Sequence, residues 1–341
     1  MLNKSFRGEV WNNIDEKVLE EIVRINGEPV DGKVGQDSYT EKATSYLQSF
    51  FAQEIAVLYT INGTAANIIA LKALLDRFGA VICAEQTHIH THECGALEYN
   101  LGNKILSVPT EDAKLTPEMI DRQLLKYRSE GYCPQVIAIT QPTELGTFYT
   151  VEEIGALVTY AHAHAMKLFV DGARLGSALA YAGCTLREMM AETGVDAFTV
   201  GGTKAGAMFG EAVVFTDKTM LRAGDYILKQ SMQHFDKSKF LGIQMLTLFE
   251  NDRWIRNFEH ANQMAQLLER KLVQKGIAPY FPVQSNMVFC VIEEDLLRRI
   301  REKFDLKYWF EDQKVVRIAT TFSTAEEDIL QLADCISYPN T

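Results

Sequence analysis

The chain has 341 residues, 47% of them hydrophobic and 23% charged, a composition typical of a globular protein with enough material for a large and a smaller domain. Its net charge of −11 argues against nucleic acid or an anionic membrane surface as the main partner, because both attract basic proteins. No apolar stretch of roughly 18 residues or more is present, and the first residues show no apolar run of the signal-peptide kind, so we expect a cytoplasmic protein without membrane segments.

The first part of the chain predicts two amphipathic helices, over 15–25 and 40–51, where apolar residues recur at helical spacing. A short apolar strand over 55–59 then leads into the turn Asn62-Gly63-Thr64 and an apolar helix over 68–75. A strand that ends in a Gly-Thr turn at the start of a helix directs backbone N–H groups and the positive end of the helix dipole to one point, which suits a phosphate. A simple helix cap is the alternative.

The middle of the chain alternates short apolar runs with helices. We predict helices over 117–129, 151–165 and 185–191, and buried strands over 80–84, 104–108, 136–140, 168–171, 197–200 and 212–215. This alternation indicates an α/β fold with a mostly parallel sheet. Ligands of such sheets bind beyond the carboxyl ends of the strands, so the residues that follow them are candidates: His88, Gln141, Asp171, Arg174 and Lys204.

Beyond residue 237 the pattern becomes mostly helical as far as about 275. A strand over 287–292, a helix over 294–304 and a strand over 315–320 follow. We therefore predict a large domain over 1–250, with an N-terminal arm, and a small C-terminal α+β domain over 251–341.

One lysine, Lys204, stands among glycines and small residues, so that nothing bulky shields its amine and burial would make it reactive. A solvated surface turn is the alternative. Asp171 ends a strand one βαβ crossover upstream, which allows both residues to reach the same edge of the sheet. A lysine for a Schiff base, an aspartate that keeps a pyridine nitrogen protonated, and a helix start for a phosphate match the needs of pyridoxal 5'-phosphate (PLP). For Asp171 and Arg174 alone, a helix cap with its exposed neighbour is the alternative.

A histidine-rich stretch follows the predicted strand over 80–84. On a strand, His88, His90 and His92 would share one face, with Glu93 and Cys94 close by, and a divalent metal site would be conceivable. The flanking residues favour a loop or a helix start instead. His88 would then be free to stack on a flat cofactor ring or to carry a proton near neutral pH.

Seven blocks occur in a fixed order along the chain: NGTAAN (62–67), CAEQTHIHTHECGALE (83–98), KLTPE (114–118), ITQPTELGT (139–147), FVDGARLGSAL (169–179), GGTKAGAMFGEAVVF (201–215) and VVRIATTFSTAEED (315–328). Together they closely resemble the bacterial low-specificity threonine aldolases, which belong to the β-eliminating lyase group of fold-type-I PLP enzymes. The resemblance runs from about residue 5 to 336. It implies an aspartate aminotransferase-like large domain with a mostly parallel sheet.

For the cofactor, the resemblance implies that Lys204 forms the Schiff base, that Asp171 pairs with the pyridine nitrogen and that His88 stacks on the ring. Its phosphate would be bound by Gly63, Thr64 and Ala65.

The resemblance also implies that Arg174 and Arg317 hold the carboxylate of an amino-acid substrate, for which the arginine fork is a suitable bidentate partner. The basic cluster Lys229, Lys237 and Lys239 resembles a segment that approaches the cofactor phosphate from a neighbouring subunit, so we expect a homodimer or homotetramer and include Lys237 among the cofactor-binding residues.

Three positions depart from the family pattern. Gly8 stands where the family has a serine near the substrate carboxylate, and Glu130 or Tyr132 stands near the place of a histidine that contacts the substrate hydroxyl. Lys239 stands where the family favours arginine. The first two departures concern the substrate rather than the cofactor.

The resemblance implies cleavage of a β-hydroxy-α-amino acid, of the threonine or allo-threonine type, to glycine and an aldehyde. His88 is our candidate for the base that takes the hydroxyl proton, directly or through water, and Glu93 is the second candidate. One alternative is PLP-dependent β-elimination that gives a keto acid and ammonia. The alternative from another class is a metal-binding or non-catalytic regulatory protein.

Overall fold

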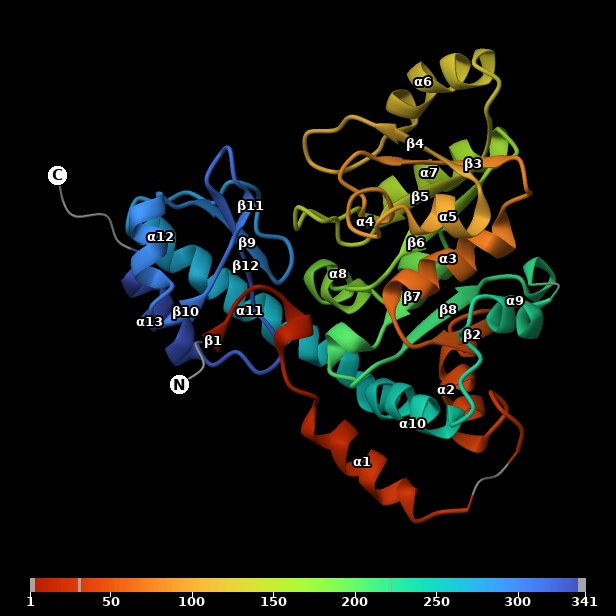
Figure 1. The fold of residues 1–341 in the computed structure, drawn as a ribbon, viewed down its shortest axis with the longest axis horizontal. Helices are drawn as coiled ribbons and strands as arrows, with labels where there is room; N and C mark the ends of the chain where they lie inside the picture. Colours follow the sequence, from red (N-terminus) through yellow and green to blue (C-terminus); the bar gives the residue numbers. More distant parts are fainter. Residues whose placement is uncertain (1–3, 30–31, 222, 337–341) are drawn as a thin grey trace.

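The computed structural model describes residues 4–29, 32–221 and 223–336, which form a large domain and a smaller one (Figure 1). The large domain is built on a seven-stranded sheet in the order β2-β8-β7-β6-β5-β3-β4. Its strands are β2 (Ala56–Thr60), β3 (Gly79–Ala84), β4 (Lys104–Val108), β5 (Cys133–Thr140), β6 (Lys167–Asp171), β7 (Ala197–Gly201) and β8 (Glu211–Phe215). Within this sheet β8 alone runs opposite to the other six strands, which confirms the predicted, mostly parallel α/β architecture.

Helices cover both faces of this sheet (Figure 1). They are α1 (Glu16–Asn26), α2 (Ser38–Gln48), α3 (Gly63–Leu74), α4 (His88–Thr91), α5 (Ala96–Leu101), α6 (Pro117–Ser129), α7 (Val151–Ala163), α8 (Leu175–Ala182), α9 (Gly224–Gln230) and α10 (Ser238–Phe249), with short turns η1 (Glu9–Trp11), η2 (Arg187–Ala191), η3 (Thr203–Ala205), η4 (Lys218–Met220) and η5 (Glu250–Asp252). On β3, Ile82 joins the core on one face while Val81 and Cys83 join the core on the other. Burial on both faces explains why the strands are continuous apolar runs in the sequence.

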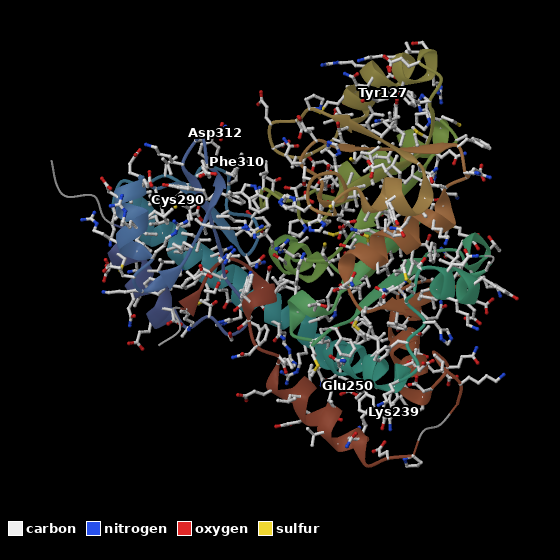
Figure 2. The ribbon with its side chains drawn as sticks, viewed as in Figure 1. Tyr127, Lys239, Glu250, Cys290, Phe310 and Asp312 are labelled. Atoms are coloured by element: carbon white, nitrogen blue, oxygen red, sulfur yellow. The ribbon has the colours of Figure 1, made fainter. Side chains whose placement is uncertain are left out.

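The small domain has an antiparallel sheet in the order β11-β12-β9, packed against helices. Its elements are α11 (Arg253–Gln274), β9 (Met287–Val291), α12 (Glu294–Ile300), β10 (Phe304–Asp305), β11 (Tyr308–Phe310), β12 (Val315–Ala319) and α13 (Glu326–Cys335). Cys290 lies inside this domain (Figure 2) and is fully buried. Long helix α11 contacts both α8 and α13 and so connects the two domains.

The N-terminal segment departs from the predicted division at residue 250. Strand β1 (Lys4–Ser5) pairs in parallel with β10, and Phe6, only 1% exposed, belongs to the small-domain core. This segment therefore packs as part of the small domain (Figure 1). A two-residue strand with one buried aromatic residue has no periodic pattern that would have revealed its partner.

Several predicted boundaries also move. The helix predicted over 68–75 begins earlier, at Gly63, and the one predicted over 294–304 ends at Ile300, so that Phe304 enters β10. The predicted 185–191 helix is a single π turn. Among the described helices, none combines the length and the apolar character needed to cross a bilayer.

Candidate active site

A cavity of about 270 Å³ lies beyond the carboxyl ends of the parallel strands, where the two domains meet. It brings together six residues that the sequence singled out from distant parts of the chain: Gly63, His88, Asp171, Arg174, Lys204 and Arg317. Its other charged or titratable lining residues are Arg7, Glu9, His92, Glu144 and Lys307. Neither Glu130, at the end of α6, nor Tyr132 lines it.

Lys204 lies in η3, between β7 and β8, and its side chain lines the cavity. The segment is therefore not the solvated surface turn of the alternative. The glycines before it are required by close backbone contacts, because a Cβ atom at Gly201 would lie 2.2 Å from the carbonyl oxygen of Ala173. Burial lowers the pKa of Lys204 and the charge of Arg174 lowers it further, against the opposing effect of nearby carboxylates. The amine is thus shifted toward the neutral, nucleophilic form.

Asp171 ends β6 and is 5% exposed. Its Oδ1 accepts the amide of Ala173 at 3.0 Å, and its Oδ2 accepts the side-chain amide of Asn67 at 2.8 Å. It does not cap α8, whose N-cap residue is Arg174. The structure thus gives no support to the helix-cap alternative, and Asp171 is a buried carboxylate held by two donors at the cavity wall.

The start of α3 reaches the same cavity through Gly63. The side chain of Asn62 caps this helix by accepting the amide of Ala65 at 2.9 Å, so that this amide is already used. A Cβ atom placed on Gly63 would meet no atom within 4 Å, which shows open space at the first turn. The amides of Gly63 and Thr64 are therefore better placed than that of Ala65 to bind a phosphate.

A chain of hydrogen bonds leads from His88 to Asp171. His88 Nδ1 lies 2.8 Å from Glu93 Oε1, the same oxygen accepts Asn67 Nδ2 at 2.8 Å, and Asn67 also reaches Asp171. The side chain of Glu93 is fully buried and does not line the cavity. Glu93 thus orients the imidazole of His88 instead of facing a ligand.

The strand that a three-histidine metal site would need is absent, because His88 opens α4 and the alternate residues diverge. No group of three or more histidine, cysteine, aspartate or glutamate side chains within residues 4–29, 32–221 and 223–336 is arranged to hold a metal. His92 instead stacks between two rings, 5.5 Å from His88 and 5.0 Å from Trp309.

Trp309 of β11 carries the stack on to Arg317, whose guanidinium carbon lies 4.1 Å from the centre of the indole ring. Arg317 Nη2 also donates to the carbonyl oxygen of Arg7 at 2.7 Å. Burial, with Arg174 adding to its effect, lowers the pKa of Arg317 to about 10, which leaves it charged at neutral pH. The sequence analysis did not identify Trp309, since a lone tryptophan between short strands carries no signal of its own.

Arg174 forms a buried ion pair that the sequence analysis missed. Its Nε and Nη2 donate to the two carboxylate oxygens of Glu9 at 2.5 and 2.9 Å, and Asn286 Nδ2 donates to Glu9 Oε1 at 2.7 Å. Two of the five N–H donors of Arg174 are therefore engaged before any ligand binds. The preceding Gly8 has φ of +151°, a conformation almost restricted to glycine.

Lys237 lies away from this cavity of its own chain. It is the N-cap residue of α10 and lines a different cavity together with Lys33 and Lys239. Lys239 is buried and donates to the carbonyl oxygens of Ile25 and Glu28 at the end of α1 (Figure 2).

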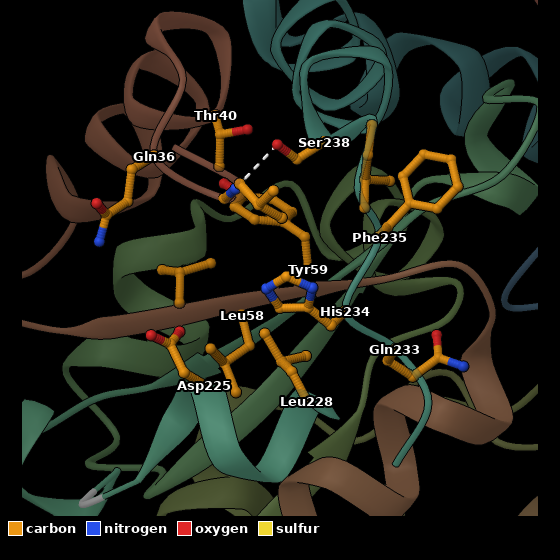
Figure 3. Close-up of a pocket in the computed structure, with 14 residues that line it drawn as sticks. Gln36, Thr40, Leu58, Tyr59, Asp225, Leu228, Gln233, His234, Phe235 and Ser238 are labelled. Carbon is orange, nitrogen blue, oxygen red and sulfur yellow. Dashed lines mark hydrogen bonds between the residues drawn. The ribbon is translucent and has the colours of Figure 1, made fainter. Parts of the chain in front are cut away.

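A further cavity of about 200 Å³ lies at edge strand β2, where α2, α9 and α10 meet. Figure 3 shows Tyr59, Asp225 and His234 on its walls, with Ser238 Oγ accepting the amide of Gly35 at 2.8 Å. Neither Lys204 nor Asp171 reaches it, so the chemistry predicted from the sequence belongs to the interdomain cavity.

The residues present fit PLP. The fit rests on a lysine with a lowered pKa, a buried aspartate and an open helix start that line one cavity. These are the groups that a pyridine ring with an aldehyde and a phosphate requires.

Comparisons with known proteins agree with this geometry. The model of the family described as beta-eliminating lyase matches residues 26–295. A low-specificity L-threonine aldolase from a Pseudomonas species is 36% identical over 302 residues, covering 88% of this chain and 87% of the relative, and that of Pseudomonas aeruginosa is 35% identical with the same coverage. The structure of Leishmania major threonine aldolase superimposes with a TM-score of 0.91 at 31% identity, covering 97% of this chain and 98% of that one. An aspartate aminotransferase from Thermus thermophilus shares the fold, with a TM-score of 0.74 at 18% identity over 98% of this chain and 91% of its own.

Proposed function

The chain belongs to the beta-eliminating lyase family, and we propose that it is a PLP-dependent aldolase that cleaves a β-hydroxy-α-amino acid of the threonine or allo-threonine type to glycine and an aldehyde. The observation that supports this most strongly is the convergence of Lys204, Asp171 and the start of α3 on the cavity that also contains Arg317. The identity to threonine aldolases over most of the chain supports the choice of substrate class.

In this proposal Lys204 attaches the cofactor covalently, Asp171 keeps the ring nitrogen protonated, and the amides of Gly63 and Thr64 hold the phosphate. When bound, PLP supplies an electron-poor ring that withdraws the electron pair left at Cα as the Cα–Cβ bond breaks. The ring of His88 provides a flat surface on which the cofactor can stack.

The substrate carboxylate binds mainly to Arg317. Arg317 is charged, is held against Trp309 and has four N–H donors besides the one given to Arg7. Arg174 contributes less than the family resemblance implies, because Glu9 already occupies two of its donors. His88 takes the proton of the β-hydroxyl, directly or through water, while Glu93 holds Nδ1 and leaves Nε2 for this task.

We expect at least a homodimer, in which the partner subunit's Lys237 approaches the cofactor phosphate. The position of Lys237 outside its own chain's active-site cavity supports this arrangement. Light scattering at assay concentration measures the assembly, and a fully active monomer would contradict the expectation. The substrate is a small amino acid, and we place the protein in the cytoplasm.

The test incubates the PLP-loaded enzyme separately with threonine, allo-threonine, phenylserine, serine, cysteine and tryptophan. We expect glycine and an aldehyde from the β-hydroxy substrates, whereas keto acid and ammonia as the main products would establish β-elimination instead. Lys204→Ala is expected to lose both the activity and the visible absorbance of covalently attached PLP. Retention of that absorbance in the variant would refute the assignment of Lys204.

A further inference from the structure

One buried carboxyl group in the active-site cavity has no role in the function proposed so far. Glu144, four residues after the end of β5, is 6% exposed and lines the cavity together with His88 and Lys204. It accepts hydrogen bonds from the backbone amide of His88 at 2.6 Å and from Thr140 Oγ1 at 3.0 Å. Both bonds end on Oε1, and the backbone amide of Glu144 also donates to the carboxylate. The carboxylate thus anchors the start of α4 and lines the cavity at the same time.

Stability alone does not explain this carboxyl group. Among the described residues no lysine, arginine or histidine forms an ion pair with Glu144, in contrast to Glu9, which is paired with Arg174. The charges of Arg174 and Arg317 reach Glu144 without a direct ion pair. Burying an acidic group without such a pair is unfavourable, so its presence in a cavity points to a function.

The surroundings of Glu144 strengthen its affinity for a proton. Burial raises its pKa, and the charge of Asp171, at the end of the neighbouring strand, raises it further. The charged and titratable groups that act on Glu144, or that it acts on, come from several elements: Asp171, Arg174, Arg317, Cys83 and Tyr149. His88 acts on it through its backbone amide. A raised pKa makes this carboxylate a stronger proton acceptor than an exposed glutamate.

We propose that Glu144 is a second catalytic group of the aldol cleavage, which receives the proton of the substrate's β-hydroxyl from His88 and holds it while the aldehyde leaves. This inference rests on the proposed function. The O–H bond breaks and its proton passes to His88 and from there to Glu144, directly or through water, as the Cα–Cβ bond breaks and the C=O bond of the aldehyde forms. The electron pair remains with Cα until a proton bonds there to give glycine, and Glu144 returns its own proton to Cα or to solvent. One proton is removed and one is added, so no further reactant is needed.

The division of labour with His88 follows from the hydrogen bonds. Glu93 fixes Nδ1 of His88, and Glu144 holds the backbone amide of the same residue. Glu144 therefore contacts the same residue that takes the hydroxyl proton first, and this contact keeps His88 and Glu144 close together at the cavity wall.

The decisive variant is Glu144→Gln. Its amide oxygen can accept the same bonds from His88 and Thr140, so α4 stays anchored, but the group cannot take up a proton. We expect kcat for allo-threonine to fall about 100-fold with little change in KM, because general acid–base groups contribute about that much or more. The acidic limb of the kcat profile is expected to disappear or shift, and Glu144→Asp is expected to restore part of the rate. Exposed Glu85 provides the matched control, and Glu85→Gln should behave as wild type.

A second measurement does not depend on turnover. The infrared carbonyl band of a protonated carboxylic acid should titrate in the wild-type holoenzyme, and the part of it that comes from Glu144 should be missing in Glu144→Gln. Identical bands in both proteins would overturn the proposal, as would a Glu144→Gln enzyme that keeps the wild-type kcat and acidic limb. If this variant loses cofactor absorbance, Glu144→Asp decides instead: an unchanged kcat overturns the proposal and a reduced kcat supports it. A wild-type enzyme that releases no aldehyde from any substrate would refute the proposed function, whereas the infrared test of Glu144 would still be decided separately.

Discussion

Replacing Glu9 by glutamine tests how the buried ion pair with Arg174 supports the fold. Burial raises the pKa of Glu9, but the charge and hydrogen bonds of Arg174, the charge of Lys204 and the amide of Asn286 outweigh it and lower the pKa from 4.5 to about 2. Each tenfold change in an ionisation constant corresponds to about 1.4 kcal/mol, so the ionised Glu9 stabilises the folded protein by about 3 kcal/mol. Removing one partner of a buried ion pair typically costs about 3–5 kcal/mol, which agrees.

The sign of the pH dependence follows from the lowered pKa. The stabilisation is fully present above about pH 4.5, where the unfolded chain is ionised too, and is lost as the pH falls toward 2. Glu9→Gln never has it, so the difference between variant and wild type should be largest at neutral pH and shrink below about pH 4.5.

Urea unfolding followed by tryptophan fluorescence, at pH 7 and at several pH values below 4.5, measures this difference. Glu302→Gln, at an exposed position in the small domain, is the control and should leave the urea midpoint unchanged. The reasoning is refuted if Glu9→Gln unfolds at the wild-type urea concentration at pH 7, or if its deficit is the same at pH 7 and at pH 3.

Three further outcomes are expected. Burial raises the pKa of Glu211 to about 7, so ionisation of Glu211 destabilises the folded protein as the pH rises from about 4.5 through 7. Glu211→Gln should therefore have a higher urea midpoint than wild type above pH 7 and a similar midpoint below pH 5. Equal midpoints at pH 8 would contradict this expectation. Gly8→Ser and Gly8→Ala should both lower the melting temperature, because a non-glycine residue at φ +151° destabilises the folded state by about 1–3 kcal/mol. An unchanged melting temperature in calorimetry would argue against this strain. Trp309→Ala removes the ring between His92 and Arg317, and with it a cation–π contact worth about 0.5–2 kcal/mol. KM should therefore rise about 2- to 30-fold at nearly constant kcat, and Trp309→Phe should give a KM between those of wild type and Trp309→Ala. Steady-state kinetics in which kcat falls and KM does not change would exclude this role.

The fold could be predicted where burial imposes a simple pattern. Strands such as β6 and β7 are mainly apolar runs because both faces of the sheet are covered, and their positions were predicted to within a residue. Helix α8 was missed for the same reason. Its residues Leu175 to Leu179 are all buried, so it has no polar face to give a helical period.

The candidate site was predictable as far as its residues end strands. Lys204 and Asp171 follow strands that share one edge of the sheet, so topology alone brings them together. Glu9 lies 165 residues from Arg174 in an N-terminal segment whose position depends on the pairing of β1 with β10. Glu144 occurs in the block ITQPTELGT, but nothing in that pattern distinguishes a cavity-facing carboxyl group from a turn residue, and only its burial and hydrogen bonds do so.

In the proposed function, the division between the domains separates cofactor chemistry from substrate preference. Lys204, Asp171 and the start of α3 all belong to the large domain, whereas Arg317 and Trp309 belong to the small one.

The N-terminal segment belongs on the substrate side, because β1 pairs with β10 and the carbonyl oxygen of Arg7 accepts a hydrogen bond from Arg317. Gly8, which departs from the family pattern, therefore lies beside Arg317, the proposed carboxylate anchor, and a Cβ atom there would sit 3.5 Å from Arg317 Nη2. Its φ value prevents a serine from being restored without moving this segment. We therefore expect changes in substrate preference relative to the family to involve the small domain and its N-terminal strand together, rather than the strand ends proposed to hold the cofactor.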